Sequence, residues 1–150
     1  MNPTEKSILA KQYFEEGYNC AQAVLLAFCE ETGLSHEQAA RLASTFGGGM
    51  GRMREVCGAV SAMFMIEGRV EGYSDPKAKT EKSEVYARVR ALADRFREKN
   101  HSIICRDLII DTETTPGGEP EERTKEYYER RPCGCYVEDA ARLIAEALNA

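Results

Sequence analysis

Six cysteines are the residues of this sequence best suited to chemistry, and their positions are more informative than their number. A cysteine can be a buried small hydrophobe, a metal ligand or a redox thiol, and a reducing compartment disfavours permanent structural disulfides. Cys29 falls inside a predicted helix, in step with its buried face, which favours simple packing. Four cysteines fall where helices or short helical turns are predicted to begin: Cys20, Cys57, Cys105 and Cys133.

A helix start is a chemically favourable place for a thiolate. Free backbone N–H groups and a partial positive charge at the start stabilise the anion, which lowers the thiol pKa and raises its reactivity near neutral pH. Arg52, Arg54 and Arg131 lie close in sequence to Cys57 and Cys133 and can strengthen this effect. The pattern therefore predicts a reactive thiol site with Cys57 as the favoured attacking residue, and packing of small buried cysteines is the alternative.

The segment Cys133-Gly134-Cys135 is a separate pattern. Two thiols one residue apart can close a small, strained and easily reduced disulfide, which suits exchange chemistry. The same pair can also offer two ligands to a metal ion. Taken alone, the pattern does not choose between these uses.

The elements that must position these cysteines are predicted to be helices. Asn2, Asn19 and Ser35 are predicted N-caps, with Pro3 at the first helical position and Gln38 completing a capping box after Ser35. No period-two strand pattern is present, so we expect an all-α fold: a compact single-domain bundle of about six to eight helices over residues 1–150. The predicted helices cover residues 3–16, 20–33, 35–46, 54–68, 77–99, 103–109, a short helix through 127–128, and 133–148.

Two connecting segments have unusual composition. Residues 47–51 read Gly-Gly-Gly-Met-Gly, which predicts a positive-φ or flexible backbone beside the cysteines, where something must approach closely. An ordinary long turn is the alternative. Residues 111–123 are acidic and rich in Pro, Gly and Thr, and they predict an exposed, mobile loop.

Composition and charge exclude some classes of protein. A net charge of −5 over 150 residues argues against a nucleic-acid partner, which would favour a basic face. No stretch approaches the length of a membrane span, and the first residues lack an apolar signal core. We therefore expect a cytoplasmic protein without membrane insertion. The mixed-charge helix 77–99 is predicted to be solvated, although a homodimer could use it.

Four segments of the sequence contain these cysteines: 17–24 (Gly-Tyr-Asn-Cys-Ala-Gln-Ala-Val), 57–61 (Cys-Gly-Ala-Val-Ser), 105–108 (Cys-Arg-Asp-Leu), and 131–133 (Arg-Pro-Cys) with 136–137 (Tyr-Val). Together they resemble a known family, the putative redox-active proteins of bacteria and archaea named for their C_GCAxxG_C_C pattern. The resemblance spans nearly the whole chain and implies redox activity, without supplying a substrate or cofactor. It leaves Cys29 and Cys135 outside the pattern, and Ala62 stands where the central motif ends in glycine.

Three functional hypotheses remain at this point. In the first, Cys20, Cys57, Cys105 and Cys133 converge at one end of the bundle for disulfide exchange or electron transfer with a redox partner or a small thiol or disulfide substrate, as a thiol–disulfide oxidoreductase would. In the second, the same four residues hold a metal ion or an iron–sulfur cluster. In the third, the protein is a non-enzymatic helical binding module. The first two hypotheses both require that the four cysteine sulfurs lie close together in the folded protein.

Overall fold

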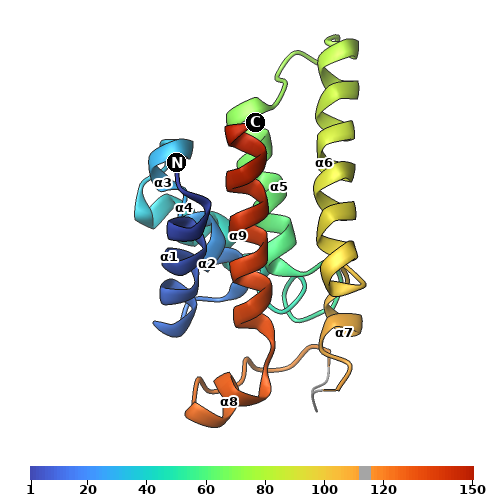
Figure 1. Ribbon diagram of the computed structural model, residues 1–150. Helices are drawn as coiled ribbons and strands as arrows, with labels where there is room; N and C mark the ends of the chain where they lie inside the picture. The colour runs from blue at the N-terminus through green and yellow to red at the C-terminus, as the bar shows by residue number, and fades with distance from the viewer. Residues whose placement is uncertain (112–115) are drawn as a thin grey trace.

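The computed structural model describes residues 1–111 and 116–150 and consists of helices packed side by side (Figure 1). Within these residues there is no β-strand, so the predicted all-α fold is confirmed. A 3₁₀ turn, Ser44–Phe46, follows the fourth helix. The α-helices are α1 (Pro3–Glu15), α2 (Cys20–Leu26), α3 (Cys29–Thr32), α4 (His36–Ala43), α5 (Gly58–Glu71), α6 (Lys79–Asn100), α7 (Cys105–Leu108), α8 (Lys125–Arg130) and α9 (Cys133–Asn149).

The predicted N-caps lie where the sequence indicated. The Asn2 side chain accepts a hydrogen bond from a backbone N–H in the first turn of α1. Asn19 and Ser35 form complete capping boxes, in which Gln22 and Gln38 return a hydrogen bond to the capping backbone. Each cap satisfies backbone donors that a helix start leaves without partners, which fixes where α1, α2 and α4 begin.

The predicted helix over 20–33 is two helices in the structure. At Phe28 the backbone leaves the helical conformation, with φ −117° and ψ 23°. The Phe28 N–H bonds to Leu25 O at 3.0 Å, three residues back, and the Phe28 side chain is fully buried. Burial of this ring outweighs continuation of the helix. Cys29 is therefore helical, as predicted, but it is the first residue of α3 and not a mid-helix position, and it is half-buried.

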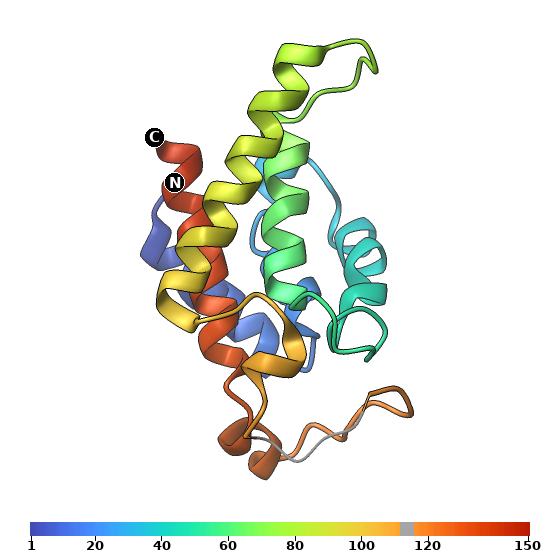
Figure 2. The same cartoon turned by 90° about the vertical axis from the view of Figure 1, so that its right-hand side faces the viewer.

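The hydrophobic core lies where α2, α5 and α9 meet. Helix α9 packs against α1, α2, α5 and α6, and α5 also packs against α2, α3 and α6 (Figures 1 and 2). The apolar α5 is thus the central helix that its composition predicts. The largest fully buried side chains include Phe14, Phe28, Phe96, Leu25, Met63, Ile66 and Ile144.

Polar contacts hold the end of α6 against α9. Lys99 Nζ lies 2.7 Å from Asp139 Oδ1, and Asn100 Nδ2 donates to Asp139 Oδ2 at 3.2 Å. These contacts hold the end of α6 beside the first half of α9, and the chain continues from there to Cys105 at the start of α7.

The exposed side of α6 is strongly charged. None of the helices in residues 1–111 and 116–150 has the length and apolar character that crossing a membrane requires.

The acidic loop 111–123 is only partly described, and residues 112–115 lie outside the described range. Its later part is fastened to the glycine-rich loop. The Gly117 N–H donates to Arg52 O at 2.7 Å, and Arg52 Nε donates to Gly117 O at 3.0 Å. Most described residues of this loop are exposed, as predicted, while Gly118, Pro120, Glu121 and Arg123 also line a pocket.

A glycine pair in α5 tests the packing of the core. A Cβ at Gly58 would lie 2.8 Å from Phe46 O and 3.1 Å from the Ala21 N, so we expect Gly58→Ala to lower the free energy of unfolding by about 1–3 kcal/mol. A Cβ at Gly68 would meet nothing within 4 Å, so Gly68→Ala should raise it by about 0.5–1 kcal/mol through helix propensity. Urea unfolding of both variants measures the difference. Equal effects would show that α5 does not depend on this close approach.

Candidate functional site

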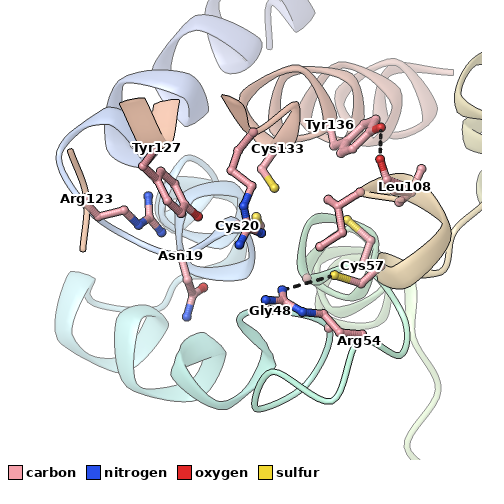
Figure 3. Close-up of a pocket in the computed structure, with 15 residues that line it drawn as sticks. Asn19, Cys20, Gly48, Arg54, Cys57, Leu108, Arg123, Tyr127, Cys133 and Tyr136 are labelled. Atoms are coloured by element: carbon pink, nitrogen blue, oxygen red, sulfur yellow. Dashed lines mark hydrogen bonds between the residues drawn. The ribbon is translucent and has the colours of Figure 1, made fainter. Parts of the chain in front are cut away.

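Four cysteines line one small cavity at the end of the bundle, where α2, α5, α7 and α9 begin (Figure 3). This cysteine cavity has a volume of about 50 Å³, and its cysteines are Cys20, Cys57, Cys105 and Cys133. Cys20 is half-buried, and the other three are buried. The predicted convergence of these residues is thus present in the structure, and neither Cys29 nor Cys135 lines the cavity.

Local sequence places each thiol at a helix start. Cys20 follows the Asn19 cap, and Cys133 follows Pro132 at the first position of α9. Cys105 begins the short α7. Cys57 is the N-cap of α5, which begins at Gly58 and not near residue 54 as its sequence suggested.

Short extended segments explain this later start and join two of the cysteines. Val56 and Ile104 form an antiparallel bridge. On either side of it, the Cys57 N–H donates to Ile103 O at 2.8 Å, and the Cys105 N–H donates to Glu55 O at 2.6 Å. The backbone around residue 56 is therefore extended, and the pairing holds Cys57 beside Cys105.

The glycine-rich loop wraps over the same end of the bundle. Residues 48–52 all have positive φ, between 54° and 71°. Three of them are glycines, and Met50 and Arg52 are L-residues in a conformation that such residues rarely adopt. Gly48 and Gly49 line the cysteine cavity. A Cβ at Gly49 would lie 2.6 Å from the Cys105 Cβ, so the expected close approach at this loop is an approach by the Cys105 segment. The loop also delivers Arg54, whose Nη1 lies 3.7 Å from Cys105 Sγ.

The thiols of Cys20 and Cys133 interact with each other in the cysteine cavity. The hydrogen bond from Cys20 is the largest cause that lowers the pKa of Cys133 to about 7, and the charges of Arg131 and Arg123 lower it further against the effect of burial. The pKa of Cys20 is raised well above its ordinary value, first by the same hydrogen bond and then by burial. Cys133 is therefore the thiol of the pair that ionises, about half of it at pH 7, while Cys20 keeps its proton.

The other two thiols of the cavity are protonated at neutral pH. Burial raises the pKa of Cys57 to about 12, although backbone N–H groups of α5 act in the opposite direction. Burial also raises the pKa of Cys105, and the neighbouring Arg54 offsets only part of that rise. Protonation therefore favours Cys133 over Cys57 as the attacking thiol, contrary to the preference that the sequence suggested.

Two residues at the cavity carry no signal in the sequence. Arg123 belongs to the acidic loop, and Tyr127 reads as part of a partly buried helix face. In the structure, the guanidinium carbons of Arg123 and Arg131 lie 4.7 Å and 5.2 Å from the centre of the Tyr127 ring. Tyr127 thus holds both cations beside Cys133. Arg131 also pairs with Glu121.

Metal binding would need a set of converging ligands. In residues 1–111 and 116–150, no group of three or more Cys, His, Asp or Glu side chains is placed to hold a metal ion. Cys20 and Cys133, which interact in the cavity, are two of the four ligands that a tetrahedral thiolate site requires.

The position that departs from the family pattern lies away from the cavity. Ala62 is fully buried in α5 and lines neither the cysteine cavity nor the larger pocket beside it. Its methyl group therefore affects helix packing and leaves the thiols unobstructed.

Comparison with known proteins agrees with the geometry. A family model described as "Putative redox-active protein (C_GCAxxG_C_C)" matches residues 18–147, a span that contains all four cavity cysteines. No curated protein and no solved structure matches the chain. The chain belongs to the C_GCAxxG_C_C family of putative redox-active proteins.

Proposed function

We propose that the protein is a dithiol–disulfide redox protein in which Cys133 attacks and Cys20 resolves. The observation that carries this proposal is the shared cavity: Cys20 and Cys133 stand at the starts of α2 and α9 and line the same small space together with Arg123 and Arg131. The interaction with Cys20 and the charges of the two arginines lower the pKa of Cys133 to about 7. A thiolate is the attacking species in disulfide exchange, and a second thiol within contact completes the reaction.

The exchange consumes two thiols of the protein and one disulfide, RS–SR. The Cys133 thiolate attacks one substrate sulfur, the S–S bond breaks, and RS⁻ leaves and takes up a proton. Cys20 then loses its proton and attacks Cys133 Sγ of the mixed disulfide, which closes the Cys20–Cys133 bond and releases the second RS⁻. The protein dithiol is oxidised by two electrons, and the substrate is reduced to two thiols.

The order of the two steps follows from the charges. The hydrogen bond with Cys133 is the largest cause of the raised pKa of Cys20. In the mixed disulfide Cys133 no longer carries a thiolate, so this cause disappears and Cys20 ionises more readily. The first step therefore activates the residue that performs the second.

Mapping of disulfides at equilibrium tests the proposal. Reduced protein is placed in thiol–disulfide buffers of increasing potential, the free thiols are trapped, and the peptides are identified by mass spectrometry. We expect a Cys20–Cys133 bond, with Cys57 and Cys105 still trapped as thiols. Absence of this bond, or a first bond between other cysteines, contradicts the proposal.

The two alternative hypotheses give different results with the same preparation. Protein purified without oxygen that contains one metal ion or cluster per chain, lost when Cys20 or Cys133 is replaced by serine, would favour the metal hypothesis. Replacement of all four cavity cysteines by serine would favour the binding module if the oxidation of the protein's thiols by a disulfide did not change.

The hydrogen bond within the pair makes a separate prediction. Cys20→Ala removes the donor, so the pKa of Cys133 should rise above about 7, whereas Cys20→Ser retains an O–H donor and should keep it lowered. Ultraviolet absorbance of the thiolate across pH measures both variants, with Cys29 and Cys135 replaced by serine to remove their signals. An identical pKa in the alanine and serine variants would assign the shift to the arginines instead.

A further inference from the structure

A second pocket, of about 270 Å³, adjoins the cysteine cavity. We call it the arginine pocket because four arginines line it: Arg52, Arg54, Arg123 and Arg131. Glu121 is the one carboxylate among its described lining residues. The two spaces share the wall formed by Asn19, Gly48, Arg54, Arg123, Tyr127 and Arg131.

The arginines are held in place by contacts within the protein. Arg52 is fixed by its two hydrogen bonds with Gly117. Arg123 donates to the backbone carbonyls of Phe14 at 3.4 Å and Tyr18 at 3.1 Å, and in the described residues no carboxylate pairs with it. Cations fixed in this way reorganise little when a ligand arrives, which favours binding.

The described residues that line this pocket carry a net charge opposite in sign to that of the whole protein. The chain carries a net charge of −5, yet guanidinium groups outnumber carboxylates four to one among the described residues of the pocket wall. A guanidinium presents five N–H donors, so an arginine engaged within the protein keeps donors for an incoming oxyanion. A concave surface of one sign also concentrates ions of the opposite sign.

The volumes of the two spaces indicate which part of a substrate each can hold. The cysteine cavity, at about 50 Å³, has room for little more than a sulfur atom and its neighbouring carbon, and Cys133 is 8% exposed. The arginine pocket is about five times larger and lies beside the same arginines that stabilise the Cys133 thiolate. The bulk of a substrate must therefore lie in the arginine pocket while its sulfur enters the cavity.

We propose that the arginine pocket binds the carboxylate groups of a small anionic disulfide, which thereby presents its S–S bond to Cys133. This inference rests on the disulfide exchange proposed above and names its substrate class. The exchange itself is unchanged: the anionic disulfide is reduced to two thiols as the Cys20–Cys133 bond forms.

Matched disulfides of different charge test the inference. Dithiodiglycolate is a dianion, bis(hydroxyethyl) disulfide is neutral, and cystamine is a dication. Each rate of oxidation of the reduced protein is divided by the rate for the same protein in urea, which removes the intrinsic reactivity of the probe. At low ionic strength we expect the normalised rate for the dianion to exceed that for the dication by about tenfold or more, and added salt to shrink the ratio.

The possible outcomes distinguish failure of the anion preference from failure of the proposed disulfide exchange. Equal normalised rates for the three probes, with a Cys20–Cys133 bond still formed, overturn the anion preference and leave the exchange intact. Failure of every probe to oxidise the pair overturns the exchange. Thiodiglycolate, a dicarboxylate thioether without an S–S bond, reports on the pocket alone: calorimetric binding that weakens with salt supports the anion site, and absence of binding contradicts it.

A single substitution gives the matched variant. Arg52 lines the arginine pocket but not the cysteine cavity, so Arg52→Gln should lower the ratio of the dithiodiglycolate rate to the neutral-disulfide rate by about threefold to tenfold. Arg41→Gln is the control, because Arg41 is a highly exposed residue of α4 that lines neither space. Equal loss with the charged and neutral disulfides in Arg52→Gln would assign Arg52 a structural role and overturn its part in anion binding.

Discussion

A Cys133→Ser variant is expected to react with a disulfide at pH 7 at least about 100-fold more slowly than the parent protein, whereas Cys57→Ser retains at least about half of the parent rate. The expectation follows from the ionisation of the two thiols. At pH 7 a thiol with a pKa of about 7 is roughly half ionised, and one with a pKa of about 12 is ionised to roughly one part in 10⁵. Loss of Cys133 removes almost all of the thiolate in the cavity.

The measurement needs a background without competing thiols. Cys135 is exposed and Cys29 is half-buried, so both are replaced by serine in every protein compared. The rate of the parent should rise with pH through about 7 and then level, because the Cys133 thiolate is the species that reacts. A Cys57→Ser variant that loses as much rate as Cys133→Ser would return the attacking role to Cys57.

The sequence is sufficient to predict where the thiols meet. Asn19 and Ser35 mark helix starts through short-range capping, and four cysteines at helix starts indicate a shared end of the bundle once the helices pack side by side. The same local logic predicts that α5 is central, because it is apolar on nearly all sides. These features depend on residues a few positions apart, which is why they are visible in a single sequence.

The order of thiol reactivity depends on distances that local patterns do not contain. A helix start lowers a thiol pKa and burial raises it, and the outcome at Cys57 is set by burial. At Cys133 it is set by Cys20, which lies more than a hundred positions away in the chain, and by Arg123 from the acidic loop. The bridge between Val56 and Ile104 is likewise a contact of single residues without a strand pattern. No local motif marks any of these partners.

The second large expected effect concerns the glycine-rich loop, which must hold Arg54 and Cys105 together. Gly49→Ala should lower the free energy of unfolding by about 3–5 kcal/mol, whereas Gly51→Ala should lower it by about 1–2 kcal/mol. Both glycines have positive φ, +71° and +54°, so both alanines incur the cost of a left-handed backbone. Only at Gly49 does the new Cβ also collide with its surroundings.

The collision at Gly49 cannot be relieved by moving one flexible side chain. The added Cβ would lie 2.6 Å from the Cys105 Cβ and 2.8 Å from both the Arg54 Cα and the Glu55 N, so main-chain atoms must move. At Gly51 no atom lies within 4 Å of the added Cβ. Urea denaturation of the two variants isolates the contact from the backbone strain. Losses that agree within about 0.5 kcal/mol would mean that the loop moves away from Cys105 at little cost, and that it does not fix the position of that thiol in the cavity.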